Sequence, residues 1–391
     1  MAFTTRLGHP LVVVVAGTRP ECLKTASLVR ALKRYAEIDV CLVNSGQHSA
    51  LVEQTFAHLG LEVDVALTPP RSGQSLSRTV AALRQSLAQC CGELRPTTIV
   101  VQGDTSTAYA GALAARDLGI PLAHVEAGLR TANPMRPFPE EAFRRRIAPI
   151  ARWHFAPTPG AAANLFAEGI AATDVRMVGN TIIDELRLAL ETRPDDPPDD
   201  RSKDARTLTL TLHRRENYGR GLDRVCGAVL EALDALAELD VVCPVHPNPA
   251  VGQRIRRLLG AHPRVQLTDP MPYRTFVRLL RRSALVVTDS GGIQEEAPYL
   301  GTPVLLARDA TERPEALVGG GTRLVPLDQA VIVAAIKQAL SRPRPVPVPF
   351  AIESPFGDGH SGVRIADALA MALDVAPTAP ALQLGALRVS A

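Results

Sequence analysis

Residues 284–296 read ALVVTDSGGIQEE, an apolar run that leads into a hydroxyl, two glycines and two carboxylates. The apolar run predicts a buried parallel strand, and the residues after it predict the start of a helix. Glycines let a ligand approach the backbone closely, and the unpaired N–H groups of a first helical turn favour a phosphate. Glu296, one turn into the helix, can accept hydrogen bonds from sugar hydroxyls. The stretch therefore favours a nucleotide-sugar site over a plain phosphate site.

Strands and helices alternate along the whole chain of 391 residues. In the first half, short apolar runs predict strands at 11–16, 98–102, 121–125, 153–156 and 175–178. In the second half, they predict strands at 207–212, 241–245, 265–268, 284–288 and 303–307. Helical patterns lie between them, the first at 21–35. The alternation predicts an α/β protein of two doubly wound, Rossmann-like domains that face a cleft, with ligands at the carboxyl ends of the strands.

The domain boundaries follow from composition. Residues 193–200 are rich in proline and aspartate with nothing to bury, which is typical of a linker. We therefore expect an N-terminal Rossmann-like domain at 8–192 and a C-terminal one at 205–355. The proline-rich run 342–349 must be extended. A last helix at 361–373 lies in a segment, 356–375, that we expect to pack back on the N-terminal domain, and 376–391 should form a loose tail.

The composition, with 46% hydrophobic and 21% charged residues, is ordinary for a globular enzyme. A net charge of +3 is too small to argue for nucleic acid or a membrane surface as a partner. No apolar run reaches membrane-spanning length and no signal-peptide core opens the chain, so we expect a cytoplasmic protein. The six cysteines show no metal-ligand spacing and should be reduced. No Gly-x-Gly-x-x-Gly follows the first strand, which disfavours a nicotinamide enzyme.

Polar side chains follow the predicted strands of the first half. Arg19 and Lys24 come after the first strand, Asp104 after the strand 98–102, and Glu126 directly after 121–125. Glu140 opens a later helix. Singly, most have ordinary explanations: a salt-bridged helix start, an N-cap aspartate, or an acidic first turn that suits the helix dipole. Glu126 is harder to explain in this way, because burying an unpaired carboxylate at a strand end costs several kcal/mol.

The second half repeats this arrangement, with His213 after the strand 207–212, His246 after 241–245 and Arg313 in the segment after 303–307. Each alone is weak evidence. Together, charged or polar groups at strand end after strand end favour a catalytic site.

The strings that carry these residues identify a resemblance. They are GTRPE at 17–21, GQH at 46–48, GDT at 103–105, HVEAGLRT at 124–131, PEE at 139–141, GNT at 179–181, HRREN at 213–217, PVHPNP at 244–249, TDSGGIQEEAP at 288–298, TERPE at 311–315 and GDG at 357–359. In this order they closely resemble the non-hydrolysing UDP-N-acetylglucosamine 2-epimerases, from about residue 11 to residue 374. The resemblance implies a glycosyltransferase-B-like fold, a homodimer, and reversible C2 epimerisation of UDP-N-acetylglucosamine (UDP-GlcNAc) to UDP-N-acetylmannosamine (UDP-ManNAc) in polysaccharide biosynthesis. It implies neither cofactor nor metal.

The resemblance also implies roles for single residues, with the carboxylates in the N-terminal domain and UDP on the C-terminal one. The residues credited with catalysis correspond to Asp104, Glu126, Glu140, His213 and Lys24. Those credited with binding the nucleotide sugar correspond to Arg19, Lys24, His213, Phe276, Ser290, Gly291, Gly292, Glu296 and Arg313. Clustered carboxylates shift each other's pKa values apart, which lets one act as acid and another as base.

Some positions depart from the family's pattern. Phe143 stands where the family usually has Asn, and Leu212 where it has Gly; Gly362 is less typical. Some bacterial members bind a second UDP-GlcNAc as an activator. Gln47, Gln74 and His246 match residues of that site, whereas Ala50 replaces a glutamine. We therefore expect catalysis to be retained and activation by substrate to be weak or missing.

Three alternatives remain: an epimerase of a modified UDP-2-acetamido sugar, a glycosyltransferase-B transferase that needs an acceptor, and a paralogue that only binds. The retained carboxylates argue against the last two.

Overall fold

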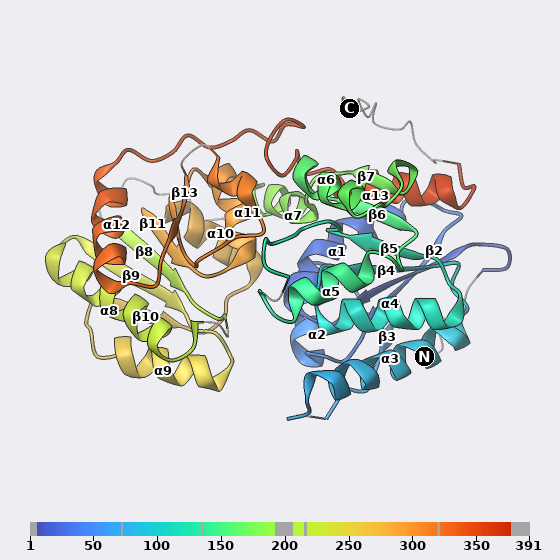
Figure 1. Cartoon of the computed structure of the whole chain (residues 1–391), viewed down its shortest axis with the longest axis horizontal. Helices are drawn as coiled ribbons and strands as arrows, with labels where there is room; N and C mark the ends of the chain where they lie inside the picture. The colour runs from blue at the N-terminus through green and yellow to red at the C-terminus, as the bar shows by residue number, and fades with distance from the viewer. Residues whose placement is uncertain are drawn as a thin grey trace. The chain divides into compact units, whose positions relative to one another are not determined.

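The computed structural model describes residues 6–71, 73–134, 136–191, 206–214, 217–318 and 321–376. The chain divides into two compact units (Figure 1). Unit 1 comprises Met1–Glu185 and Ala351–Ala391, and unit 2 comprises Leu186–Phe350. The boundary at Glu185 lies inside a helix. The predicted linker at 193–200 lies outside the described residues, and so does the predicted tail apart from its first residue, Ala376.

Unit 1 is built on a parallel sheet with the strand order β3-β2-β1-β4-β5-β6-β7. Its strands are β1 (Leu11–Ala16), β2 (Asp39–Asn44), β3 (Val65–Ala66), β4 (Thr98–Gln102), β5 (Leu122–Val125), β6 (Trp153–Ala156) and β7 (Val175–Met177). Its helices are α1 (Arg19–Leu32), α2 (Ser49–His58), α3 (Leu76–Leu94), α4 (Ser106–Leu118), α5 (Glu140–Ile147), α6 (Pro159–Ala167), the short 3-10 turn η1 (Ala172–Asp174), α7 (Thr181–Leu190), which continues into unit 2, and α13 (Ser361–Ala372).

The central strand β1 shows why this sheet is covered on both faces. All six of its residues are buried. Because successive side chains of a strand point to opposite faces, Val12 and Val14 enter one core and Val13 and Val15 another. The first core includes residues of α1, α2 and α13, and the second includes residues of α3, α4 and α5. A continuous valine run is therefore the signature of a strand between two helical layers.

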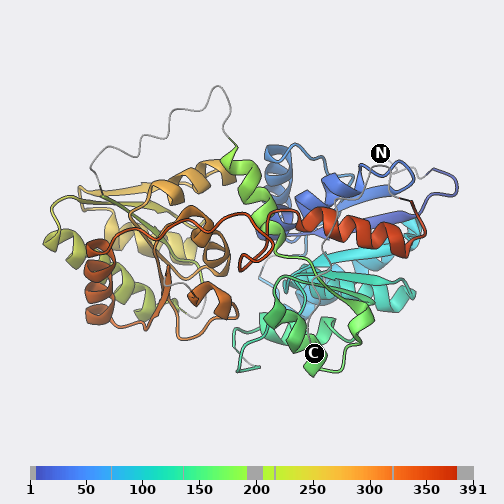
Figure 2. The same cartoon turned by 90° about the horizontal axis from the view of Figure 1, so that it is seen from above.

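The C-terminal helix α13 packs against α1 within unit 1 (Figure 2). At the contact, a Cβ on Gly362 would lie 2.6 Å from the Ser27 carbonyl carbon, so only glycine allows this approach. The Asp184 carboxylate of α7 accepts hydrogen bonds from the N–H groups of Ser361 and Gly362, at 3.1 and 2.7 Å. These contacts satisfy the first turn of α13 and explain the atypical Gly362.

Unit 2 has a six-stranded parallel sheet in the order β10-β9-β8-β11-β12-β13. Its strands are β8 (Arg206–Thr211), β9 (Leu239–Pro244), β10 (Val265–Thr268), β11 (Leu285–Thr288), β12 (Val304–Ala307) and β13 (Thr322–Val325). Its helices are α8 (Arg220–Ala235), α9 (Pro249–Leu259), α10 (Tyr273–Arg282), α11 (Gly291–Leu300), the 3-10 turn η3 (Pro314–Leu317) and α12 (Gln329–Ser341). One apolar core joins the sheet to α8, α9 and α12, and it includes Leu212.

The predicted fold class is confirmed: both units are parallel, doubly wound α/β domains. The strands predicted at 11–16, 98–102, 153–156 and 265–268 have the same bounds in the structure, and the others differ by one or two residues at their ends. The helix predicted at 21–35 begins two residues earlier, because Thr18 is extended and Pro20 lies in the first helical turn. The six cysteines are free and buried. Within the described residues, no helix could cross a membrane.

Candidate functional site

Each sheet has a point at which the strand order reverses, and ligands of such folds bind beyond the strand ends there. In unit 1 this point lies between β1 and β4, and in unit 2 between β8 and β11. The segments that follow these four strands carry Arg19 and Lys24, Asp104, His213, and the Ser290-Gly291-Gly292 turn.

Glu126 and Lys24 form a buried ion pair in unit 1. Lys24 Nζ lies 2.7 Å from Glu126 Oε1, and the two side chains are only 7% and 6% exposed. The Gln102 amide donates to the other carboxylate oxygen of Glu126. The backbone of Glu126 has a φ of +66°, in the left-handed region that non-glycine residues rarely adopt and that is enriched at functional sites. The carboxylate is therefore held between an ammonium and an amide at the end of β5.

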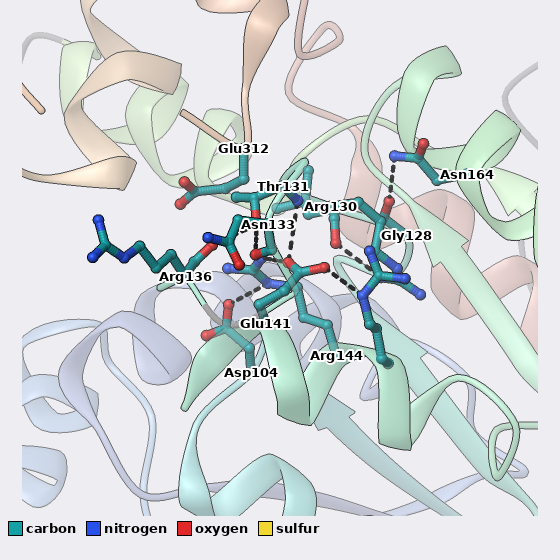
Figure 3. A network of polar contacts seen from close by, with 12 residues as sticks. Asp104, Gly128, Arg130, Thr131, Asn133, Arg136, Glu141, Arg144, Asn164 and Glu312 are labelled. Carbon is teal, nitrogen blue, oxygen red and sulfur yellow. Dashed lines mark hydrogen bonds and ion pairs between the residues drawn. The ribbon is translucent and has the colours of Figure 1, made fainter. Parts of the chain in front are cut away.

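Asp104 belongs to a second network (Figure 3). The Nε of Arg144 donates to Asp104 Oδ2 at 2.7 Å, and a second nitrogen of Arg144 donates to Glu141. Glu141 is fully buried and also accepts from Arg145 and from the Thr131 backbone N–H. The N-cap of α4 is Thr105, so Asp104 does not serve as the cap. Arg144 thus fixes the orientation of the Asp104 carboxylate, which is 27% exposed.

Two further predicted site residues of unit 1 begin helices. Arg19 is the first residue of α1 and Glu140 the first residue of α5, and both are partly exposed. Phe143, one turn further along α5, is buried and stacks on Tyr109 with ring centroids 4.8 Å apart. The aromatic residue at this position therefore serves the core between α4 and α5.

In unit 2, Asp289 joins the segments that follow β8 and β11. Its fully buried carboxylate accepts from the backbone N–H groups of His213 and Arg214, each at 3.0 Å, and from the Asn217 amide at 2.9 Å. His213 Nδ1 lies 3.1 Å from Asp289 Oδ1. Burial alone would raise the pKa of Asp289, but the hydrogen bonds and the nearby His213 hold it below its usual value. An ionised Asp289 places the Nδ1–H of His213 toward itself and leaves Nε2 for a ligand.

The N-terminus of α11 follows Asp289 directly. Ser290 is the N-cap but makes no side-chain cap hydrogen bond. A Cβ on Gly292 would meet only the Ser290 hydroxyl, at 4.0 Å, so the space beside this glycine is open. A Cβ on Gly291 would instead lie 2.8 Å from an Arg313 guanidinium nitrogen. The first turn of α11 therefore combines helix N–H groups with an adjacent cation, an arrangement that suits a phosphate.

Carboxylates hold Arg313 in place. Its Nε donates to Glu295 and its Nη1 to Glu312, while Glu312 also accepts from Arg308 at 3.1 Å. Glu296 is nearly buried and accepts from the Tyr273 hydroxyl. Phe276, the other predicted contact, lies partly buried on the same helix as Tyr273.

The three residues matched to an activator site lie in different units. In unit 1, Gln47 accepts from the backbone and hydroxyl of Thr107, and Gln74 lines a pocket of about 280 Å³. In unit 2, His246 stacks on His213 with centroids 5.7 Å apart. Within the described residues, no group of three or more His, Cys, Asp or Glu side chains could hold a metal ion.

Sequence reasoning missed several residues that support these sites. They are Glu21, Gln102, Glu141, Arg144, Asp289, Glu295 and Glu312. All except Gln102 lie within the quoted strings or one turn beyond them, so the signal was present. Some of their partners, however, are distant in sequence, such as Thr105 for Glu21 and Arg313 for Glu295, and no pattern within one element reveals such pairs.

Two doubly wound units define the class by fold: a glycosyltransferase-B-like protein, with a helix N-terminus next to an arginine in one unit and a carboxylate–cation cluster in the other. The comparison with protein families is more specific. The model of the UDP-N-acetylglucosamine 2-epimerase family matches residues 30–370. The chain belongs to this family.

Relatives and solved structures agree. The chain is 38% identical over 371 residues to the UDP-N-acetylglucosamine 2-epimerase of Escherichia coli K12, covering 92% of this chain and 98% of the relative. It is 37% identical to that of Bacillus subtilis, covering 92% and 94%. The UDP-GlcNAc 2-epimerase of Neisseria meningitidis, solved bound to UDP-GlcNAc, superposes with a TM-score of 0.85 at 34% identity, covering 92% of this chain and all of that one.

Proposed function

We propose that the protein reversibly epimerises C2 of UDP-GlcNAc to give UDP-ManNAc, by anti elimination of UDP to 2-acetamidoglucal and re-addition of UDP. Family membership establishes the class of reaction. The observation that carries the proposal to this chain is the buried Lys24–Glu126 pair at the end of β5, with the Arg144-bound carboxylate of Asp104 after the neighbouring strand β4. The solved Neisseria relative with UDP-GlcNAc bound supports the choice of substrate.

The chemistry needs these residue types. C2 of a 2-acetamido sugar has no adjacent carbonyl, so its proton cannot be removed by simple enolisation. In the proposed route a base takes the C2 proton, the electron pair forms the C1–C2 double bond, and the C1–O bond breaks to release UDP with its negative charge. Protonation of C2 on the opposite face and attack of UDP at C1 then give the epimer. Only protons and UDP move, so the route requires no redox cofactor.

We assign the proton transfers to Asp104, Glu126 and Glu140, with Lys24 beside them. Glu126 is held by two donors and Asp104 by Arg144, which fixes the orientation of both carboxylates rather than leaving them free to rotate. Arg19 adds a cation at the start of α1 for the departing diphosphate. The same preorganisation stabilises the positive charge that develops on the ring.

We assign UDP to unit 2. The N–H groups of Gly291 and Gly292 at the start of α11, with Arg313 next to them, form the diphosphate site. His213, oriented by Asp289, directs Nε2 to the leaving group. Ser290 and Glu296 supply hydrogen bonds to the nucleotide sugar, and Phe276 contacts the base. The proposal includes a homodimer that acts in the cytoplasm, as the resemblance to the family implies.

The test is incubation with UDP-GlcNAc alone, without acceptor, metal or nicotinamide, followed by identification of products by NMR. A mixture of UDP-GlcNAc and UDP-ManNAc is the expected result. Accumulation of UDP and free N-acetylmannosamine would show a hydrolysing enzyme instead. An absence of reaction would leave a transferase, or an epimerase of a modified UDP-2-acetamido sugar, as the function.

A further inference from the structure

Glu21 is a fully buried carboxylate in unit 1 that no step of the proposed reaction uses. It lies in the first turn of α1 and accepts hydrogen bonds from two segments. Its Oε2 accepts from the Gly17 backbone N–H and from the Thr18 hydroxyl, each at 2.9 Å. Its Oε1 accepts from the hydroxyl of Thr105, in the segment after β4. The contacts therefore cross the point at which the strand order reverses, between β1 and β4.

The donors determine the state of the carboxylate that these contacts need. The Gly17 N–H can only donate. The Thr105 hydroxyl accepts from the Ala108 N–H as the N-cap of α4 and donates its own proton to Glu21. Both oxygens of an ionised Glu21 are thus acceptors, one for each segment. Protonation of Glu21 replaces charge-assisted hydrogen bonds with neutral ones, which are roughly half as strong, and so weakens the connection.

A capping box explains only part of this arrangement. Thr18 is the N-cap of α1 and Glu21 the third helical residue, the spacing at which a glutamate reaches back to the N-cap. This reach back to the start of the helix accounts for the contacts with Gly17 and Thr18, although the Thr18 hydroxyl here donates to Glu21 and makes no cap hydrogen bond of its own. It does not account for Thr105, which caps a different helix 84 residues further along the chain.

The two connected segments carry the residues assigned to catalysis. Thr105 follows Asp104 directly, and Gly17 and Thr18 lead into the helix that carries Lys24, the partner of Glu126. The Gly17 segment is also tightly enclosed, because a Cβ there would lie 2.1 Å from the Ser45 hydroxyl. A Cβ on Gly17 would also lie 2.2 Å from the Thr107 hydroxyl, so a change in the Glu21 contacts acts on two closely packed segments, one of which carries Asp104.

We propose that Glu21 is a positioning residue for the epimerisation: its ionised carboxylate connects residues 17–18 to residues 103–105 and sets the position of Asp104 relative to the Lys24–Glu126 pair. The inference rests on the proposed function, and it adds to that function a group that touches no substrate.

The ionisation of Glu21 falls in the working range of pH. Burial raises the pKa of Glu21 to about 7, against the hydrogen bonds from Thr105, Gly17 and Thr18, which lower it. The titratable groups on the neighbouring segments include Arg19, Cys22 and Lys24 on α1, Asp104 next to Thr105, and His48, whose backbone N–H donates to the Gly17 carbonyl. As the pH falls through 7, Glu21 binds a proton, the connection weakens and kcat should decrease.

The experiment compares Glu21→Gln and Thr105→Val with a matched control, Glu185→Gln. Glu185 is also a buried carboxyl of unit 1 whose pKa is raised to about 7, but it pairs with Arg30 and contacts neither segment. The measurements are the pH profile of kcat, UDP affinity by calorimetry, and hydrogen–deuterium exchange of residues 17–24 and 103–108. Thr105→Ser, which keeps the hydroxyl, should lose less activity than Thr105→Val.

We expect Glu21→Gln and Thr105→Val to lower kcat roughly 10-fold to 100-fold, the effect of a small misplacement of catalytic groups, with UDP affinity unchanged. The decrease of wild-type kcat below pH 7 should be absent from Glu21→Gln, and both segments should exchange faster. If only residues 17–24 exchanged faster, Glu21 would serve the start of α1 alone, and the proposal would be wrong. A wild-type kcat in Glu21→Gln would also contradict the proposal. If the wild type does not epimerise UDP-GlcNAc, the proposed function fails, whereas exchange of residues 103–108 still decides whether the connection exists.

Discussion

Replacement of Glu126 by Gln tests the central ion pair of unit 1. The wild-type carboxylate lies 2.7 Å from Lys24 Nζ, with both side chains almost fully buried. Glu126→Gln keeps the shape of the side chain but removes its charge. Loss of one partner from a buried ion pair leaves the other charge in a medium that solvates it poorly, and this costs about 3–5 kcal/mol of stability.

The effect on catalysis should be separate from the effect on stability. If Glu126 transfers a proton, Glu126→Gln lowers kcat by a factor on the order of 10² or more. Lys24→Met combined with Glu126→Gln removes both charges, so part of the lost stability should return. The activity should not return, because neither group is then present to act on the sugar.

The assay combines urea denaturation with initial rates of UDP-ManNAc formation. Asp269→Asn is the control, because it removes a carboxylate from an ion pair with Arg256 in which the side chains are 51% and 89% exposed, and such a pair is worth only about 0–1 kcal/mol. Two results would refute the reasoning: a near-wild-type rate for Glu126→Gln, or a stability equal to that of Asp269→Asn.

Three further predictions concern other parts of the chain. Gly292→Ala should weaken UDP binding, because its methyl would occupy the open space next to the first turn of α11; unchanged affinity in calorimetry, with the fold intact, would reject the phosphate site. Glu185 has a pKa raised from 4.5 to about 7 by burial, so the native state binds its proton more tightly than the unfolded state does, and the stability that this provides is lost as the pH rises from 4.5 to 7. The free energy of unfolding of Glu185→Gln minus that of the wild type should therefore increase over this range, by up to about 3 kcal/mol, and a difference that does not change with pH would contradict this. Ala50 lacks the amide that the resemblance places in an activator site, and one hydrogen bond to a charged ligand is worth roughly 1.5–3 kcal/mol, so activation by substrate should be weak. Conversion of pure UDP-ManNAc should then start without a lag, whereas a lag abolished by a trace of UDP-GlcNAc would show that the activator site is intact.

The strands of the two sheets could be predicted well where they are apolar and central. β1 and β4 are continuous buried runs, and both have the predicted bounds. The strands that were not predicted are weaker signals. β3 has only two residues, and the run of β13 is interrupted by Arg323, which is exposed. β2 is fully buried, but it begins with Asp39 and ends with Asn44. Because of these polar ends, the sequence pattern did not predict it as a core strand.

The candidate site could be predicted as a set of strand ends but not as a set of contacts. The periodic pattern places Glu126 after β5 and Lys24 on α1, and only the fold shows that the two side chains meet. Likewise, sequence predicted Asp104 as an N-cap or a catalytic group, and the structure gives the cap to Thr105 and an Arg144 partner to Asp104. Such pairs depend on the packing of distant segments, which propensity and periodicity do not encode.

The measurement that tests the account most directly is proton NMR of the reaction in heavy water, starting from UDP-GlcNAc. Elimination and re-addition remove the C2 proton and return one from the active site, so UDP-ManNAc should carry deuterium at C2, and deuterium should also enter recovered UDP-GlcNAc as the reaction reverses. UDP-ManNAc that keeps its original C2 proton would contradict removal of that proton by a base, and with it the catalytic roles assigned to Asp104, Glu126 and Glu140.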